Sequence, residues 1–526
     1  MTGSVQTWLR QFIGLVGILT AITTVGIAET ATGVVFQDRD GDGQRNPSER
    51  GISGIRVSNG RNIVSTDTSG RWSLPVLEGS ETDFFVIKPK GWMVPLDSRK
   101  LPRFAYIHKP TGSPSLKYPG LKPTGDLPKS IDFPLVKQDE PETFQAIFFG
   151  DTQPRDLREV EYIAHDTVEE LVGHPAKFGV TLGDIVFDDL SVMEPLAGTI
   201  AMIGLPWWNV IGNHDVNTDA TDAQAYNDTY NRIYGPSYFS FDYGPVHFIA
   251  LDNIRWTPPG DRSTNRATWK PALDGQQLEW LERDLSFVKR ETLVLLMMHV
   301  PIDDMLNRKE VYRLIESRPY CLSIAGHTHY QEHRFLKRDD GWKGSKPHHH
   351  IVNVTVCGSW FTGQPDEWGI PHATMADGAP NGYTVLTFKD RNVTVDYKAS
   401  RRPMDYQMSL YAPESIAATM ASSTNLYVNV FNGSDSSRVE FRVDESTPWI
   451  ALRKTLEPDP YYLAARAREP EKLALPWRAL GAPMKSPHLW KATLPDGLAP
   501  GVRTIRVRAT DVHGRWHTAE RVITIQ

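Results

Sequence analysis

The chain has 526 residues, of which 40% are hydrophobic, and its formal net charge is −6. That length is enough for about three domains, and the hydrophobic content is enough to build packed cores. A slightly acidic balance without blocks of Lys and Arg gives no nucleic-acid-binding signature, so it argues against the phosphate backbone of a nucleic acid as the main partner.

The first 28 residues carry a single charged side chain, Arg10, followed by an apolar run over 12–28. The run ends in Gly26-Ile27-Ala28, which puts small residues at positions −3 and −1 of a cleavage site before Glu29, as in secretory signal peptides. A short, uncleaved membrane anchor is the alternative, because the run is close to the ~17-residue lower limit for spanning a bilayer. In both cases we expect the rest of the chain to lie outside the cytoplasm, periplasmic or secreted, with no further membrane span.

An acidic loop follows a strand-like segment at 32–36. With Asp38 as position 1, the segment 38–49 places oxygen ligands at the positions of a calcium-binding loop: Asp38, Asp40, Asp42, the carbonyl of Gln44, Asn46 and Glu49. Strand-like segments surround the loop in place of amphipathic helices. We therefore predict a structural Ca²⁺ site in an N-terminal β-sandwich spanning 29–137; an acidic solvated turn is the alternative.

The segment 108–129 is rich in Pro, Gly, Ser and Lys and shows no periodicity. Such a composition predicts a tether or a long loop before the central domain, which we place at 138–404.

Five short apolar segments of the central domain each end in residues that bind metals in proteins. The endings are Asp151 and Gln153, Asp184, Asn213 with His214 and Asp215, His299, and His327 with His329. One Asp or His after a strand is commonly a solvated loop residue or a helix cap. Five in succession predict one shared metal centre, because ligands gather beyond the carboxyl ends of the strands of a sheet.

In order and type, the motifs Gly-Asp-Thr-Gln, Gly-Asp-(x)3-Asp-Asp, Gly-Asn-His-Asp, Met-His and Gly-His-Thr-His resemble those of the calcineurin-like metallophosphoesterases. The resemblance covers about 144–400, and with a domain at either end the chain is similar to the secreted bacterial branch. It implies that 138–404 is a phosphoesterase catalytic domain with an α/β four-layer sandwich, two β-sheets flanked by helices. The alternation of strand-like and helix-like patterns agrees with this fold.

The resemblance also implies two divalent metal ions, Mn, Mg, Zn or Fe, which would generate hydroxide at neutral pH and neutralise the phosphoryl oxygens. It assigns Asp184 as the bridge between both ions, Asp151 and His329 to the first ion, and Asn213, His299 and His327 to the second. Gln153 departs from the commoner His of the family. A neutral amide oxygen suits Mn or Mg better than Zn or Fe, and it would bind directly or through water.

His214 is implied to lie beside the metals, outside their direct ligands. We expect it to act as the general acid that protonates the leaving oxygen while a metal-bound hydroxide attacks, with Asp215 orienting and charging the imidazole. The same resemblance implies that the mouth of the cleft is lined by Trp360, Asp366, Trp368, Asn381 and Tyr383.

Two further groups of residues are candidates for a functional site. His348-His349-His350 alternate faces on a strand, so they cannot all bind one ion, although one of them is expected to reach the cleft. The only cysteines, Cys321 and Cys357, lie in apolar runs. Buried free thiols are the prediction for them, and a disulfide in an oxidising compartment is the alternative.

From 405 onwards, short strand-like runs separated by turns predict a C-terminal β-sandwich at 405–526, with an immunoglobulin-like arrangement. The complete chain is thus expected to be a secreted phosphoric ester hydrolase, acting on phosphomonoesters or phosphodiesters that are small molecules or are linked to glycans or lipids. An extracytoplasmic binding or adhesion protein with a degenerate phosphoesterase domain is the alternative, and the complete ligand set argues against it.

Overall fold

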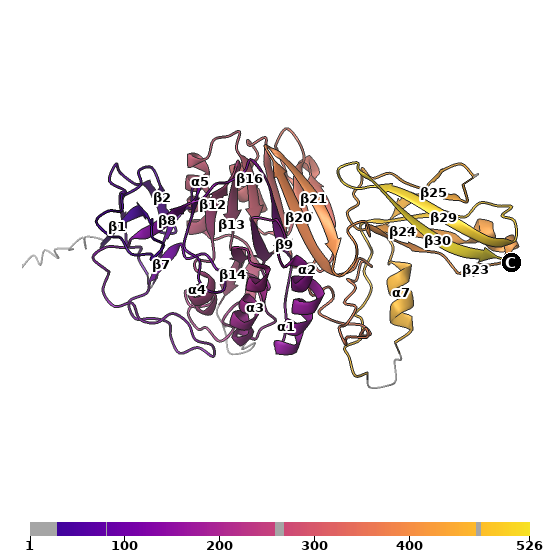
Figure 1. Ribbon diagram of the computed structural model, residues 1–526, viewed down its shortest axis with the longest axis horizontal. Helices are drawn as coiled ribbons and strands as arrows, with labels where there is room; N and C mark the ends of the chain where they lie inside the picture. The colour runs from indigo at the N-terminus through magenta and orange to yellow at the C-terminus, as the bar shows by residue number, and fades with distance from the viewer. Residues whose placement is uncertain (1–28, 80, 258–267, 446, 470–474) are drawn as a thin grey trace, which may run out of the picture.

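A computed structural model describes residues 29–79, 81–257, 268–445, 447–469 and 475–526. Three domains follow one another along the long axis of the molecule (Figure 1). The predicted signal peptide or anchor at 1–28 lies outside the described residues. Within the described ranges, we find no helix with the length and apolar character needed to cross a membrane.

The N-terminal domain is a sandwich of two four-stranded sheets. One sheet has the order β4 (Arg71–Pro75), β1 (Thr30–Gln37), β8 (Phe133–Lys137), β6 (Trp92–Met93), and the other β3 (Ile63–Ser65), β2 (Arg56–Ser58), β5 (Thr82–Val86), β7 (Ala105–His108). Between them, the ring of Trp72 packs against Phe84 and Phe133 at centroid distances of 5.7 and 5.8 Å. Alternation of apolar and polar residues along these short strands produces the buried face, as the sequence predicts.

The segment between β7 and β8 is a long loop that is fixed to the central domain. The backbone N–H of Lys117 donates to Asp219 at 2.6 Å, and the hydroxyl of Tyr118 donates to the carbonyl of Asp188 at 3.3 Å. Of the two alternatives for this segment, tether or long loop, the structure shows a packed loop. It brings the N-terminal domain to residue 188, next to the predicted metal centre.

Buried ion pairs also join these two domains. Lys109, directly after β7, donates to Asp228 at 2.5 Å and to Glu81 at 2.7 Å, and its side chain is 2% exposed. Arg56 of β2 pairs with Asp242 of the central domain at 2.6 Å. An ion pair inside such an interface leaves an uncompensated charge when one partner is removed.

The first sheet of the central domain has five strands in the order β11 (Trp207–Val210), β10 (Phe178–Leu182), β9 (Thr143–Phe149), β20 (Gly382–Lys389), β21 (Asn392–Ala399). β9, β10 and β11 are parallel, so their carboxyl ends lie at the same edge. The outer face is covered by α1 (Leu157–Ile163), the π-helix η1 (Ala164–Val168), α2 (Glu169–Leu171) and α3 (Met193–Ile200). Among the apolar residues at helical spacing, Val160, Val168 and Leu171 are buried on this face, whereas Leu157 is 58% exposed.

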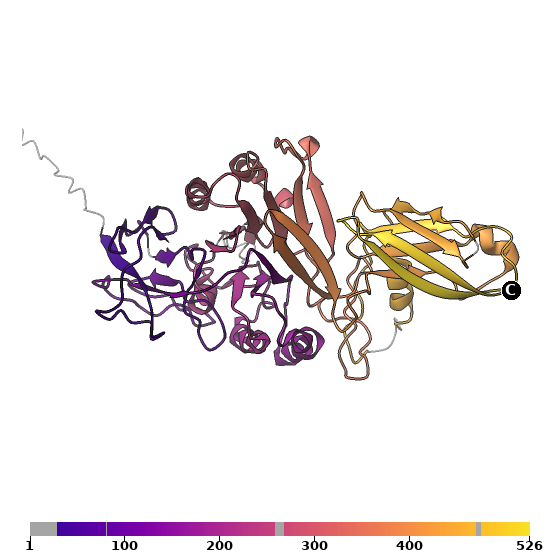
Figure 2. The same ribbon diagram turned by 45° about the horizontal axis from the view of Figure 1, so that its top comes forward.

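The second sheet has six strands in the order β12 (Phe239–Tyr243), β13 (Val246–Ala250), β16 (Leu293–Met297), β17 (Cys321–Ala325), β19 (His348–Val352), β18 (Glu332–Leu336). Its outer helices are α5 (Gly275–Phe287) and α6 (Arg308–Ile315), which lie on the opposite side of the molecule from α1 and α3 (Figure 2). Phe178 of the first sheet meets Phe248 of the second at 5.2 Å. The predicted four-layer sandwich is therefore confirmed. The smaller elements α4 (Asp228–Tyr234), β14 (Ile254–Thr257) and β15 (Thr268–Pro271) border it.

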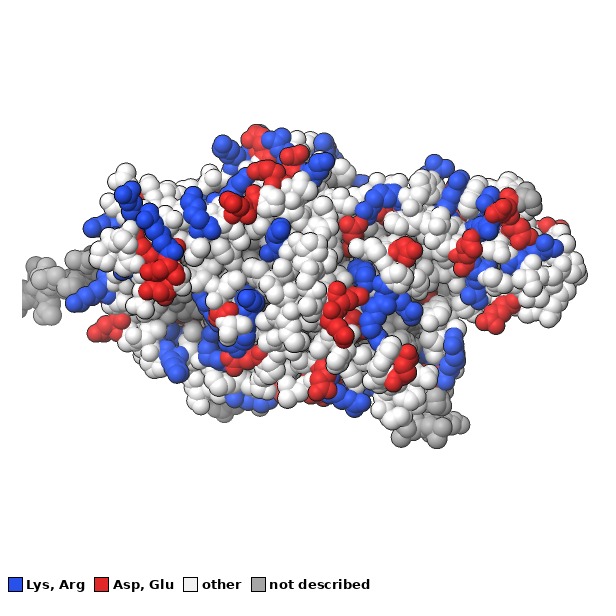
Figure 3. All heavy atoms as spheres, viewed as in Figure 1, with Lys and Arg blue, Asp and Glu red and all other residues white. Residues whose placement is uncertain are grey.

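The C-terminal domain is again a sandwich of two sheets. One sheet has the order β22 (Met408–Tyr411), β24 (Asn425–Val430), β28 (Leu489–Thr493), β27 (Arg453–Thr455). The other sheet has the order β23 (Ser415–Ile416), β30 (Trp516–Ile525), β29 (Gly501–Thr510), β25 (Val439–Val443), β26 (Ile450–Ala451). Helix α7 (Pro460–Ala467) lies on the side of this domain that faces the central domain (Figure 1). Lys and Arg side chains are interspersed with Asp and Glu on the face drawn in Figure 3.

Candidate metal centre

Five loops that leave parallel strands meet at one edge of the two central sheets. Asp151, Asp184 and Asn213 follow β9, β10 and β11 of the first sheet, and His299 and His327 follow β16 and β17 of the second. Because the strands run in the same direction, their carboxyl ends bring these side chains together from sequence positions up to 176 residues apart.

Close approach of the loops depends on glycine at two positions. A Cβ at Gly212 would lie 2.3 Å from Asp184 Oδ1, and a Cβ at Gly326 would lie 2.3 Å from Asp151 Oδ1. Several of the predicted ligands also have backbones in the left-handed region, with φ of 42° at Gln153, 46° at Asp184, 74° at His327 and 54° at His329. Such strained backbones cluster at functional sites, where the surrounding structure holds them in place.

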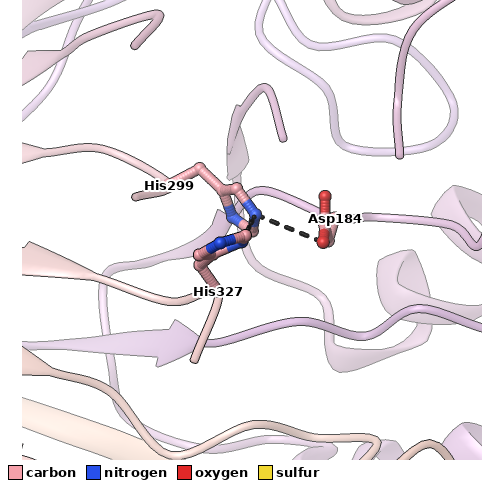
Figure 4. Close-up of side chains that lie close together, drawn as sticks. All are labelled: Asp184, His299 and His327. Atoms are coloured by element: carbon pink, nitrogen blue, oxygen red, sulfur yellow. Dashed lines mark hydrogen bonds and ion pairs between the residues drawn. The ribbon is translucent and has the colours of Figure 1, made fainter. Parts of the chain in front are cut away.

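Asp184, His299 and His327 form the tightest group, with one ligand atom from each within 4.8 Å of the others (Figure 4). His299 Nε2 lies 3.2 Å from Asp184 Oδ2, 3.1 Å from Asn213 Oδ1 and 3.1 Å from His327 Nδ1. One carboxylate, one amide and two imidazoles thus face a common point, a donor set suited to a borderline divalent cation.

Asp151 and His329 form a second group beside the first. His329 Nδ1 donates to the carbonyl of Gly358 at 2.6 Å, which leaves the lone pair of Nε2 pointing at Asp151 Oδ2, 3.2 Å away. His299 is oriented in the same way, because its Nδ1 donates to the carbonyl of Leu182 at 2.9 Å. Metal-binding histidines typically donate their other ring N–H to a carbonyl or carboxylate, which fixes the tautomer.

Two observations indicate that these residues fit divalent cations. Asp151 Oδ2 is buried and accepts no hydrogen bond in the described structure, although an imidazole nitrogen faces it. In the first group, burial and the neighbouring His299 lower the pKa of His327 to about 4. Burial would also lower the pKa of His299, but the negative charge of Asp184 outweighs this effect and raises that pKa to about 9. Buried carboxylates and imidazoles that compete for protons in this way are satisfied together by a bound cation.

Gln153 lies at the junction of the two groups. Its side-chain nitrogen donates to Asp184 Oδ2 at 3.1 Å, and its oxygen lies 3.9 Å from Cys357 Sγ. An amide turned by 180° presents its oxygen to the same point, so the position suits a ligand as the sequence predicts. Cys357 is buried here as a free thiol, and Cys321 is also free but half-buried.

The imidazole of His214 is held by Asp188, so the predicted orienting role of Asp215 is wrong, although the charge of Asp215 adds to those of Asp188 and Asp184 in raising the pKa of His214. We expected Asp215 to orient this ring, but Asp188 Oδ1 lies 2.7 Å from His214 Nδ1. Asp215 is fully buried and accepts the backbone N–H groups of Val186 at 3.1 Å and Gly212 at 2.8 Å, so it ties two loops together. Burial and the neighbouring Asp184 raise the pKa of Asp215 to about 7.

Aromatic rings cover three histidines of the site. Trp360 lies on His329 with ring centroids 4.1 Å apart, Phe187 stacks on His214 at 4.7 Å, and Trp269 meets His327 edge-on at 5.6 Å. Of these, only Trp360 was predicted at the mouth. Phe187 and Trp269 carry no sequence signal beyond being aromatic, because their contacts depend on the fold.

The other predicted mouth residues lie elsewhere. Asp366 pairs with Arg401 at 2.6 Å in a cavity of about 710 Å³ between the central and C-terminal domains, which Trp368 also lines. Asn381 is buried and bonds to the carbonyl of Val356 at 3.0 Å, and Tyr383 is 4% exposed, packed against Phe149. Asp366, Trp368 and Asn381 thus line the cavity between the two domains, and Tyr383 packs in the core.

The histidine triplet does not reach the metal centre. His348 and His350 both contact Ser323 Oγ, at 2.8 and 2.7 Å, and His349 pairs with His333 at 3.0 Å. The strand does alternate its faces as predicted: His348 and His350 are buried on one face, and His349 is half-buried on the other.

The N-terminal acidic loop brings Asp38, Asp40 and Asp42 together, with one oxygen from each within 4.8 Å of the others. Glu49 accepts the backbone N–H groups of Arg39 at 2.8 Å and Asn46 at 3.0 Å, and thereby closes the loop. Calcium binding stays a prediction.

Comparison with known families decides the identity of the chain. Residues 144–331 match the calcineurin-like phosphoesterase family, 39–118 match the N terminal of calcineurin-like phosphoesterase, and 350–517 match the C terminal of calcineurin-like phosphoesterase. The chain belongs to the calcineurin-like phosphoesterases. This phosphoesterase is therefore a metal-dependent hydrolase of phosphate esters. The range 350–517, which matches the C terminal of calcineurin-like phosphoesterase, includes β20 and β21 of the first central sheet, so this match overlaps the central domain.

Among solved structures, 27 chains are similar to this phosphoesterase. One is the purple acid phosphatase PPD1 isolated from seeds of yellow lupin (Lupinus luteus), at 12% identity and a TM-score of 0.34, over 67% of this chain and 69% of that one. A likeness this weak carries no argument about function. No curated protein matched the sequence.

Proposed function

We propose that this protein is a secreted phosphoric ester hydrolase that works with two divalent cations and uses His214 as its general acid. The observation that carries the proposal is the convergence of carboxylate, amide and imidazole groups from five loops on one sheet edge. Secretion rests on the signal-like pattern at 1–28.

The residues that would hold the cations divide into two groups around Asp184. Asp151, His329 and Gln153 would serve one, and Asn213, His299 and His327 the other. When bound, such ions supply Lewis acidity and neutralise charge on the phosphoryl oxygens. Mn or Mg fits the amide oxygens of Gln153 and Asn213.

His214 has the orientation that a proton donor requires. Its Nδ1 donates to Asp188, so its Nε2 points toward the metal ligands, 4.0 Å from Asp184 Oδ2. Burial alone would lower the pKa of His214, but the hydrogen bond to Asp188 and the charge of Asp184 outweigh it and raise that pKa. A protonated Nε2 at this point can pass its proton to the leaving oxygen of the ester.

Replacing His214 by Asn tests the assignment with two esters. A nitrophenolate leaves without a proton, whereas an alkoxide needs one, so turnover of an alkyl phosphate should fall by about 10²- to 10⁴-fold and that of a nitrophenyl ester much less. Metal content, measured by inductively coupled plasma mass spectrometry, should stay at the wild-type level. Asp184→Ala should abolish both activities.

His165→Asn is the matched control, because that side chain is 67% exposed and pairs with Glu169 at 3.2 Å on the helix surface. Equal losses for both esters in His214→Asn would contradict the general-acid role. Absence of any hydrolysis by the wild type with Mn, Mg, Zn or Fe, on monoesters and diesters alike, would contradict the proposed activity itself.

A further inference from the structure

Arg155 lies at the outer edge of the metal centre, between two of the rings that cover histidines. Its guanidinium is 4.2 Å from the ring centroid of Phe187, which in turn stacks on His214. Its Nη1 donates to the carbonyl of Trp360 at 3.1 Å, and the ring of Trp360 covers His329. The ring of Phe187 therefore separates Arg155 from His214, so the guanidinium sits one ring's breadth outside the proposed general acid.

The C-terminal domain places a second arginine beside the first. Arg478 follows α7, and its carbonyl accepts the backbone N–H of Gly363 at 2.8 Å, which fixes its segment against the loop that carries Trp360. The guanidinium of Arg478 pairs with Glu159, whose carboxylate also lies 3.5 Å from Arg155 Nη1. Glu159 is 2% exposed, so two cations from different domains share one buried carboxylate.

The carboxylates around this pair already have other partners. A cavity of about 340 Å³ adjoins it, lined among others by Arg158, Glu159, Tyr162, Phe361, Trp477 and Arg478. Asp156, also on its wall, accepts the N–H of Glu159 at 3.0 Å, and Glu159 accepts the N–H of Arg155 at 2.7 Å, so both carboxylates already have backbone partners. Arg155, Arg158 and Arg478 thus meet Asp156 and Glu159, and Asp188, a further carboxylate near Arg155, is held by His214 at 2.7 Å.

We propose that Arg155 and Arg478 bind an anionic group on the alcohol part of the substrate, which rests on the proposed function of the metal centre. The preferred substrates are phosphate esters whose leaving group carries a second negative charge about one ring away from the phosphorus. Guanidinium groups bind carboxylate and phosphate oxygens with paired N–H donors. Trp360, which is 36% exposed, offers its free surface to the part of the substrate in between.

Two aryl esters that differ in the charge of one para substituent test the proposal. 4-Carboxyphenyl phosphate carries its carboxylate one ring away from the phosphate, and 4-carbamoylphenyl phosphate has a neutral amide of similar shape at the same position. The wild type should hydrolyse the carboxylate ester with a kcat/KM about tenfold higher, mainly through a lower KM, since the contact binds ground state and transition state equally.

Arg155→Gln and Arg478→Gln should each bring the ratio of the two kcat/KM values close to one, and Arg478→Lys should restore part of it by returning the charge. Arg453→Gln is the matched control, because Arg453 is exposed on β27 of the same domain as Arg478, and its ratio should equal that of the wild type. Circular dichroism and metal content establish that each variant is folded and loaded.

Equal hydrolysis of both esters by the wild type, or an unchanged ratio in Arg155→Gln, would overturn the inference while leaving the phosphoesterase assignment intact. Hydrolysis of neither ester by the metal-loaded wild type, nor of any other phosphate ester, would instead overturn the proposed function and this inference with it.

Discussion

Replacing Lys109 by Met should destabilise the protein strongly at pH 8, because it removes the cation that two buried carboxylates share. Asp228 is fully buried, Glu81 is 13% exposed, and both lie within 2.7 Å of the Lys109 ammonium. Burial also raises the pKa of Glu81, and burial together with Glu81 raises that of Asp83 well above its ordinary value. The site thus already holds as much negative charge as one ammonium can compensate.

The expected loss in the free energy of unfolding is about 3 to 5 kcal/mol, the usual cost of leaving buried charges without their partner. At about 2 to 4 °C per kcal/mol for domains of this size, the transition of the docked N-terminal and central domains should fall by about 10 °C. The loss should shrink at pH 5. A carboxyl whose pKa is raised by folding contributes its full stabilisation of the folded state at pH values below its pKa in the unfolded chain. That contribution is lost as the pH rises through its pKa in the folded state.

Differential scanning calorimetry at pH 5 and pH 8 measures both effects. Lys90→Met is the matched control, because Lys90 pairs with Glu142 at 2.5 Å while the two side chains are 48% and 62% exposed. An exposed pair of this kind contributes less than about 1 kcal/mol. If Lys109→Met were as stable as Lys90→Met at pH 8, the buried ion pair would not be what holds the two domains together.

Two further predictions concern cations. Chelation of calcium with EGTA should lower the melting temperature of the N-terminal domain, because an ion bound only by the folded loop stabilises the folded domain. In calorimetry, the double variant Asp40→Ala, Glu49→Ala should lose this response to EGTA, and it should keep its hydrolase activity. An unchanged response in that variant would refute the calcium loop. Gln153→His should shift the metal preference of activity from Mn toward Zn or Fe, since imidazole is the stronger donor to those ions. Identical activity profiles across the metals for both proteins would place residue 153 outside the ligand set.

The sequence predicted which side chains lie close together where one local rule applied. Each of Asp151, Asp184, Asn213, His299 and His327 follows an apolar run, which for all but His299 ends at a glycine, and a buried parallel sheet brings such ends together. The layer architecture followed from the same runs, because their length and apolar character are typical of covered strands. These predictions needed only the order of residues along short segments.

What the sequence could not predict depends on contacts between distant segments. The choice of Asp188 over Asp215 as the partner of His214 is set by where the loop after β10 passes, 26 residues from the histidine. Adjacency in the sequence suggested Asp215, whose side chain turns inward to the backbone instead. Arg478 reaches Glu159 across 319 residues, and such contacts arise only when domains dock.

The pairing of β9 with β20 has a consequence for how the chain folds during synthesis. The strands β1 to β8 of the N-terminal domain lie within residues 30–137, so they can pair as soon as those residues have emerged, whereas their apolar core is completed by the central domain. β9, by contrast, pairs with residues 384–389, more than 230 positions later, through six registered pairs from Phe148 to Thr143. A truncated chain that stops before residue 382 would retain every predicted ligand from Asp151 to His329, yet leave β9 as an open sheet edge on which other chains can add a strand.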